Sequence, residues 1–267
     1  MTQAERRLFL IRSLLDEKTE YRDLDIPRDA GGQRRLLRSL MNVRAPGAAD
    51  GAFLNIQDAY LRQELAEAGI TELDELTPVC GGLYLWQGDI TRLRCGAIVN
   101  AANSGMTGCY IPCHACIDNC IHTYAGVQLR LDCARLMVEQ GHEEPTGRAK
   151  LTRAYNLPCD YILHTVGPIV EDRVTAKQER LLVSCYRSCL ELAEEHGVAS
   201  IAFCCISTGV FRFPNERAAE IAVETVRRYK KETDSEIKVI FNVFKDTDRK
   251  IYEGLLRADR ADAQGTR

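Results

Sequence analysis

Short apolar runs rich in β-branched residues alternate with longer segments of helical periodicity from Leu83 onward. The predicted strands cover 83–87, 96–100, 152–155, 161–166, 200–206 and 237–244, and the predicted helices cover 118–140, 175–196, 215–232 and 247–258. Helices that connect successive strands make those strands parallel. The pattern therefore predicts an α/β fold around a mainly parallel sheet, with ligands bound at the carboxyl ends of the strands.

The first 77 residues have a different pattern. Apolar residues recur at helical spacing over about 4–18, 32–43 and 52–69, and the segments "IPRDAGG" and "APGAADG" separate these runs. The pattern contains neither the apolar region of a signal peptide nor a membrane span. We therefore expect a helical N-terminal extension over residues 1–77, an α/β domain over 78–267, and a cytoplasmic location.

Charge and cysteine content restrict the possible partners. The net charge is -3, and no long basic run is present, so nucleic acid and membrane surfaces are not expected partners. Twelve cysteines occur in 267 residues without a repeating framework, which favours reduced thiols over a disulfide scaffold. Cysteines that cluster are then candidate metal ligands.

The stretch "CISTGVFRFPNERAAEIA", residues 205–222, has the design of a phosphate cradle. An apolar strand ends in Ser207, Thr208 and Gly209, and a helix follows with Asn215 as its expected N-cap. Backbone N–H groups that converge before a helix N-terminus favour a diphosphate. An ordinary tight turn is the alternative.

Two other strand ends carry polar side chains. Asp89 in "WQGDIT" could accept a hydrogen bond from an exocyclic amine such as that of adenine, or it could cap a turn. Asn100 and Asn103 in "IVNAANSG" could present an amide to sugar hydroxyls, although asparagine in turns is often structural.

The stretch "GMTGCYIPCHACIDNCIH" holds four cysteines and two histidines, and thiolate and imidazole both bind Zn²⁺. Two ligand sets compete. Cys113, His114, Cys116 and Cys120 would close a four-ligand structural site, whereas Cys109, His114 and Cys116 would leave one position open. A metal-free loop and a disulfide between Cys113 and Cys116 are further alternatives.

Five motifs in order, "GDIT", "VNAANS", "ID-x-x-IH", "TGRAKLTRAYNLPCDYILHTVGP" and "CISTGVFRFP", resemble the macrodomain, an ADP-ribose-binding α/β module, and most closely its MacroD-type hydrolases. The resemblance covers about 83–258 and implies a mixed, mainly parallel sheet flanked by helices. It also implies that adenine is bound by Asp89, by the backbone of Ile90 and by stacking on Phe244, and the distal ribose by Asn103. The diphosphate would be held by backbone groups of Ser207, Thr208, Gly209, Val210 and Phe211.

The cysteine-rich stretch replaces the glycine run of ordinary MacroD-type enzymes. The spacing of Cys109, His114 and Cys116 resembles that of the zinc-dependent macrodomains, a microbial branch that also carries a helical N-terminal extension. This resemblance implies Zn²⁺ as the cofactor, acting as a Lewis acid at the distal ribose. Asp118 would orient or activate a water together with Asn103, and His122 would be either its partner or a packed core histidine.

The activity that the resemblance implies is zinc-dependent removal of mono-ADP-ribose from a protein side chain, with linkage to an acidic residue. The implied partner is a lipoylated carrier similar to the glycine-cleavage H protein, modified by a sirtuin-like ADP-ribosyltransferase. Two alternatives are open. The protein could be a non-catalytic reader of ADP-ribose with a structural zinc, or a deacetylase of O-acetyl-ADP-ribose.

Overall fold

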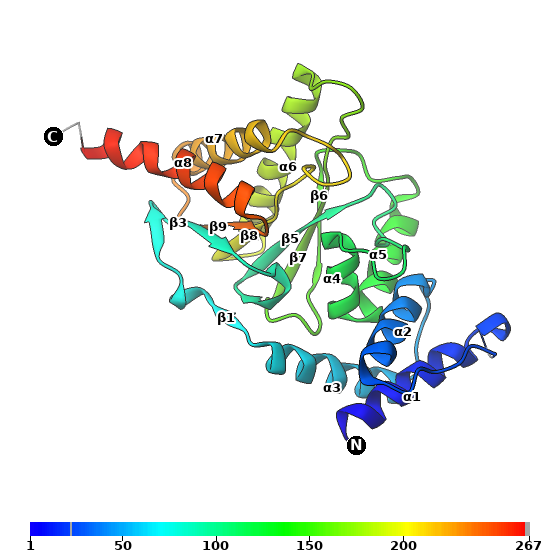
Figure 1. Cartoon of the computed structure of the whole chain (residues 1–267). Coiled ribbons are helices and arrows are strands. Elements are labelled where there is room, and N and C mark those ends of the chain that lie inside the picture. Colours follow the sequence, from blue (N-terminus) through cyan, green and yellow to red (C-terminus); the bar gives the residue numbers. More distant parts are fainter. Residues whose placement is uncertain (22, 265–267) are drawn as a thin grey trace.

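A seven-stranded mixed sheet forms the centre of the protein (Figure 1). The structure is a computed structural model that describes residues 1–21 and 23–264. Its order is β2-β3-β9-β8-β5-β7-β6. The strands are β2 (Pro78–Cys80), β3 (Leu83–Gln87), β5 (Ala97–Ala102), β6 (Ala149–Arg153), β7 (Tyr161–Val166), β8 (Ser200–Phe203) and β9 (Lys238–Val243). Only the outermost pairs, β2 with β3 and β6 with β7, are antiparallel. The predicted mixed, mainly parallel sheet is confirmed.

Helices follow most of the strands, as the alternating pattern predicts. They are α4 (Ile117–Ala125), α5 (Val127–Gln140), α6 (Ala176–Glu195), α7 (Asn215–Thr233) and α8 (Asp246–Gln264). The prediction of one helix over 118–140 was wrong, because Gly126, with φ of 103°, ends α4 and begins a new helix. The predicted strand over 200–206 was too long, since β8 ends at Phe203 and the next residues form the loop toward α7.

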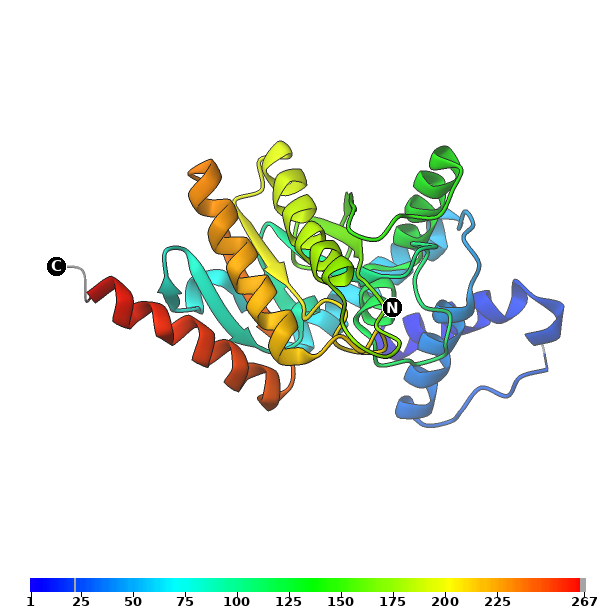
Figure 2. The ribbon, with the colours of Figure 1, turned by 90° about the horizontal axis from the view of Figure 1, so that it is seen from above.

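The central strands are buried on both faces. Every residue of β8 is buried, as are Ala97, Ile98 and Val99 of β5, which explains their continuous apolar sequence. Helices α6 and α7 pack side by side, and α8 packs against α7 (Figure 2). The main apolar core includes residues from all of these elements, so the sheet is a rigid support for the loops at its edge.

The N-terminal region forms α1 (Gln3–Asp16), α2 (Ala30–Val43) and α3 (Gly51–Ala68), each with a side-chain N-cap: Thr2, Asp29 and Asp50. These helices share an apolar cluster of their own, to which Val127 of α5 also belongs. They lie beside α4 and α5, far from α7 and α8 (Figure 1). Among the described helices, none is long and apolar enough to cross a membrane.

Short elements join the two regions. The two-residue strands β1 (Thr71–Glu72) and β4 (Leu93–Arg94) pair in parallel as a separate small sheet. The 3₁₀ helices are η1 (Thr19–Tyr21), η2 (Leu73–Glu75) and η3 (Ile90–Arg92). Because β1 precedes the main sheet and β4 lies between β3 and β5, this pairing ties the N-terminal segment to the loop that contains Asp89.

Candidate active site

The predicted site residues all follow strands that are parallel and adjacent in the sheet. Asp89 follows β3, Asn103 follows β5, Ser207 follows β8 and Phe244 follows β9. The carboxyl ends of parallel strands lie at one edge of a sheet. The fold therefore brings these four segments to a common edge.

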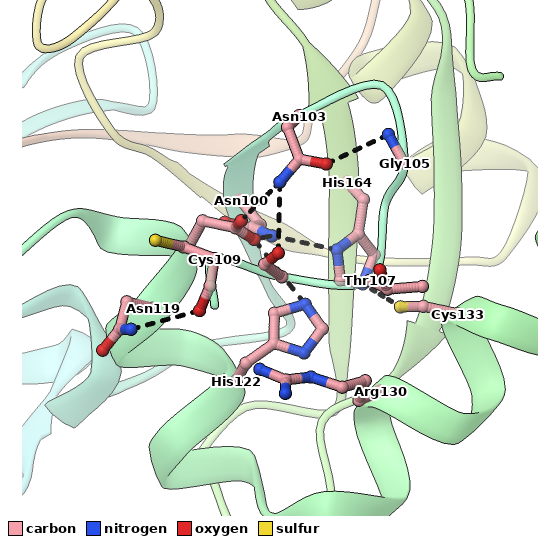
Figure 3. A network of polar contacts seen from close by, with 12 residues as sticks. Asn100, Asn103, Gly105, Thr107, Cys109, Asn119, His122, Arg130, Cys133 and His164 are labelled. Carbon is pink, nitrogen blue, oxygen red and sulfur yellow. Dashed lines mark hydrogen bonds and ion pairs between the residues drawn. The ribbon is translucent and has the colours of Figure 1, made fainter. Parts of the chain in front are cut away.

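Asp118, on the first turn of α4, is held between the side-chain amides of Asn100 and Asn103. Figure 3 labels these two asparagines within the network of polar contacts. Its Oδ1 accepts a hydrogen bond of 2.8 Å from Asn100 Nδ2, and its Oδ2 accepts one of 3.3 Å from Asn103 Nδ2. Asn103 is fixed in turn, since its Oδ1 accepts from the N–H of Gly105 and its amide also donates to the carbonyl of Gly108. The carboxylate and the ribose-binding candidate thus form one hydrogen-bonded unit.

Burial changes the protonation chemistry of Asp118. The side chain is only 4% exposed, and this burial raises the pKa of Asp118 to about 6, against the lowering effects of the Asn100 hydrogen bond and of Arg130. A carboxyl group with such a pKa can exchange a proton near neutrality, as a general base must.

His122 lies one turn beyond Asp118 on the same face of α4. Burial lowers the pKa of His122 well below its usual value, so the ring is neutral. Its Nε2 lies 3.6 Å from Asp118 Oδ1, which is too long for a hydrogen bond. Gly108 packs directly on the ring: it has φ of 87°, and a Cβ there would lie 2.8 Å from two of the ring carbons. His122 therefore supports the loop that leads to Cys109.

The side chains of Cys109, His114 and Cys116 converge as the sequence predicts. One ligand atom of each lies within 4.8 Å of those of the other two, and Cys109 Sγ is 3.6 Å from His114 Nδ1. Cys116 is also the N-cap of α4, and its sulfur accepts a hydrogen bond from the N–H of Asn119. The helix N-terminus and this N–H favour the thiolate of Cys116, but burial has the larger and opposite effect.

This donor set fits Zn²⁺. In a tetrahedral site with Zn–S near 2.3 Å and Zn–N near 2.0–2.1 Å, a sulfur and a nitrogen lie about 3.6 Å apart. Burial raises the pKa of the Cys116 thiol to about 12, the N–H of Asn119 opposes this rise, and the neighbouring Cys109 sulfur adds to it. A bound cation would remove the cost of placing two thiolates together.

Cys113 and Cys120 point to other partners. Among the described residues, the three-donor group does not include either of them. Cys113 Sγ contacts Ser39 Oγ at 3.2 Å and the carbonyl of Arg35, and Cys120 Sγ accepts from Arg38. The closed four-ligand arrangement is therefore not assembled, and all twelve cysteines are free thiols, including Cys113 and Cys116.

The loop after β8 has the form of an anion cradle. Ser207 adopts φ of 66°, and its carbonyl accepts from Phe213. Within the part of the chain that the structure describes, no protein group accepts a hydrogen bond from the N–H groups of Gly209, Val210 or Phe211. These are residues that the sequence predicts to bind a diphosphate.

The helix that follows this loop differs from expectation in its N-cap. The N-cap of α7 is Pro214, and Asn215 lies within the helix, where its amide donates to Asp248 at 2.5 Å. The prediction of Asn215 as N-cap was therefore wrong, because proline fixes the extended backbone that the cap position needs. Arg212 is exposed, so it would contribute little to binding.

At another strand end on this edge of the sheet, Asp89 both caps a turn and keeps a free oxygen. Its Oδ1 accepts from the N–H and the hydroxyl of Thr91, while no described protein group donates to Oδ2. Ile90 is buried, so its side chain does not face a ligand at this edge. Phe244 is 76% exposed after β9, which rules out a role in the core and suits stacking on a base.

Several residues in this region could not be identified from sequence. Asn119 is fully buried and donates to the carbonyls of Cys109 and Ile111, yet it lacks any sequence signal beyond its position next to Asp118. Arg38 and Arg130 reach the same region from other helices. His164 is fully buried, and its ring contacts the amide of Asn100.

Comparisons with known proteins agree with this geometry. The Macro domain family model matches residues 99–222. The protein-ADP-ribose hydrolase of Treponema medium is 59% identical over 260 residues, covering 96% of this chain and 100% of that protein. The protein of the same name from Staphylococcus aureus is 48% identical over 253 residues, covering 94% and 95%. The crystal structure of the Trypanosoma brucei macrodomain in complex with ADP-ribose superposes with a TM-score of 0.64 at 31% identity, covering 82% of this chain and 94% of that one.

Proposed function

Because the chain belongs to the macrodomain family, we propose that it is a hydrolase that removes mono-ADP-ribose from modified proteins and that it uses Zn²⁺ held by Cys109, His114 and Cys116. The observation that carries this proposal is the position of Asp118. Its buried carboxylate is held by the amides of Asn100 and Asn103, and it lies two residues after the predicted ligand Cys116. Its hydrolytic class is supported by the similar proteins named protein-ADP-ribose hydrolase.

Each part of ADP-ribose has a matching group along this edge of the sheet. The unpaired oxygen of Asp89 and the exposed ring of Phe244 suit adenine, together with the backbone of Ile90. The free N–H groups of residues 209–211, with Ser207 and Thr208 before them, suit the diphosphate. Asn103 is left to orient the distal ribose, whose anomeric carbon would then lie near Asp118.

Asp118 would accept a proton from the attacking water, since it is the carboxylate closest to Asn103. Asn100 and Asn103 hold the carboxylate in place during this transfer. When bound, Zn²⁺ would supply a Lewis acid beside the distal ribose.

The finer specificity is also a proposal. We expect linkage to an acidic side chain, and a lipoylated carrier similar to the glycine-cleavage H protein as the target of a sirtuin-like ADP-ribosyltransferase. A panel of mono-ADP-ribosylated peptides linked through glutamate, serine or arginine tests the linkage. Release from the serine or arginine peptides alone would refute it.

The division of the chain is proposed to lie near residue 77. The apolar cluster of α1–α3 supports this division, because Val127 is the single member from beyond that position among the described residues.

One assay separates the catalytic-zinc proposal from its alternatives. The protein is incubated with a mono-ADP-ribosylated protein before and after metal removal by a chelator, and Cys116→Ala is compared with Cys80→Ala as a cysteine control far from the donor group. Release at the full rate after verified metal removal would refute the role of zinc. Tight ADP-ribose binding without release from any linkage would favour a reader, and activity on O-acetyl-ADP-ribose alone would favour a deacetylase.

A further inference from the structure

We propose that helix α2 of the N-terminal extension is a brace that holds the metal-ligand loop, residues 109–116, in its binding conformation, with Arg38 as the main positioning residue. This inference rests on the proposed function only for the identity of the ligands. The contacts themselves join segments that are more than seventy residues apart in the sequence.

One nitrogen of the Arg38 guanidinium contacts one acceptor in the loop and two acceptors on α4. Its Nη2 lies 2.8 Å from the carbonyl of His114, 2.9 Å from Asn119 Oδ1 and 3.5 Å from Cys120 Sγ. The first contact fixes the backbone of one predicted ligand. The two hydrogens on Nη2 suit the two short contacts, and the charge of the guanidinium strengthens both.

Asn119 connects Arg38 to the two predicted cysteine ligands through hydrogen bonds. While its Oδ1 accepts from Arg38, its amide nitrogen donates to the carbonyl of Cys109 at 3.2 Å, and its backbone N–H donates to Cys116 Sγ at 3.4 Å. Arg38 and Asn119 together contact all three predicted ligands. Because Asn119 is fully buried, any loss of one partner leaves an unsatisfied polar group.

Asn42, one turn further along α2, controls the middle of the loop. Its Oδ1 accepts from the N–H of Cys113 at 2.9 Å, and its amide donates to Thr123 of α4. Cys113 has φ of 53°, a conformation that costs energy in a residue with a Cβ and is maintained only where neighbours determine it. Asn42 and Ser39 are such neighbours, and the residue they hold directly precedes His114.

Arg130 of α5 fixes the position of α2 itself. Its Nη1 donates to the carbonyls of Asn42 and Arg44 at the C-terminal end of that helix, at 2.7 and 2.6 Å, and its guanidinium lies 4.3 Å from the ring centroid of Tyr110 in the loop.

The contacts with α2 also assign a role to Cys113 and Cys120. In this proposal they are contact residues to α2, and they are not metal ligands.

The brace can be tested with full-length protein and a readout that does not need activity. We expect Arg38→Met to raise the dissociation constant for Zn²⁺ about 10- to 100-fold, the usual effect of losing a partner that orients a ligand. Competition with a chromophoric chelator measures this constant. Arg34→Met is the matched control, since Arg34 lies on the same helix and pairs with Glu64 of α3.

Hydrogen exchange in the metal-free protein tests the loop without zinc. Arg38→Met should speed amide exchange over residues 109–116, and Arg34→Met should leave it unchanged. Unchanged exchange and zinc affinity within twofold of wild type in a folded Arg38→Met variant would refute the brace. If wild type binds no zinc but its loop exchange still depends on Arg38, the metal proposal fails and the brace stands.

Substitution of the extra cysteines tests their assignment. With Co²⁺ in place of zinc, Cys113→Ala and Cys120→Ala should keep one metal per chain and the same thiolate charge-transfer absorption, whereas Cys116→Ala should lose absorption. A decrease in either of the first two variants would make that cysteine a ligand and contradict the inference.

If Arg38→Met does not fold, Arg38→Lys keeps the charge without the planar guanidinium and is measured in the same way.

Discussion

The amide of Asn100 and the ring of His164 are joined by a contact of 3.1 Å between Nδ2 and Nδ1. The same amide nitrogen donates to the carboxylate of Asp118, so it must be a donor toward His164 as well. The ring is neutral because burial lowers the pKa of His164 to about 3. Its hydrogen is therefore on Nε2, which donates to Thr152 Oγ1 at 2.9 Å. Thr152 on the edge strand thus helps to orient Asp118 through two intermediate side chains.

Thr152→Val should lower kcat by about tenfold while KM stays within about twofold, since the lost interaction orients the carboxylate and does not bind substrate. Without its acceptor, the buried N–H at His164 Nε2 would be unsatisfied, and the ring would be held less firmly against the Asn100 amide. Steady-state hydrolysis of a mono-ADP-ribosylated protein measures both constants. Thr152→Ser keeps the hydroxyl and should behave as wild type, so equal losses in the two variants would contradict this orientation.

Asp89→Ala should weaken ADP-ribose binding about 10- to 100-fold, as expected for the loss of a hydrogen bond to a charged acceptor worth about 1.5–3 kcal/mol. Calorimetry measures the affinity directly. Thr91→Val is the control, because it removes one of the capping contacts and leaves the carboxylate in place. An unchanged affinity in Asp89→Ala would remove Asp89 from the adenine site.

Gly108→Ala should destabilise the fold by about 2 kcal/mol or more, because a Cβ there combines a left-handed backbone with a clash against His122. We also expect weaker zinc binding, since Gly108 directly precedes Cys109. Urea unfolding and chelator competition measure the two effects. Gly254→Ala on α8 is the control, with open space around its Cβ, and should be neutral or slightly stabilising.

The metal-free protein should become less stable as the pH is lowered, because the His164 ring is buried in its neutral form. The unfolded state takes up a proton near pH 6.5, whereas the folded state resists it until about pH 3, so the contribution is complete above 6.5 and is lost as the pH falls between these values. Between pH 7 and pH 5 we expect a loss of about 2 kcal/mol from this residue. Urea unfolding with chelator present measures how the free energy of unfolding changes with pH. This dependence should correspond to about one proton fewer taken up on unfolding in His164→Asn than in wild type. Equal pH dependence in the two proteins would contradict the prediction.

Much of the fold could be predicted because its strands are fully buried. The runs at 97–102, 161–166 and 200–203 are mainly apolar, and nearly all of their residues are buried, which gives a strong local signal. The break between α4 and α5 was missed because helical periodicity continues across Gly126, and only its left-handed backbone shows that two helices meet there. The prediction placed the N-cap of α7 at Asn215, whereas the structure has it at Pro214, one residue earlier.

The sequence by itself determined the α/β fold and its mainly parallel sheet, because both depend on local patterns of apolar residues. It also offered Cys109, His114 and Cys116 as candidate metal donors, through their resemblance to the zinc-dependent macrodomains. The tertiary structure decided what those donors contact. Arg38 lies 76 residues before His114, and no local pattern relates them. Their hydrogen bond exists because α1–α3 pack beside α4 and α5, and such long-range contacts depend on how whole helices pack.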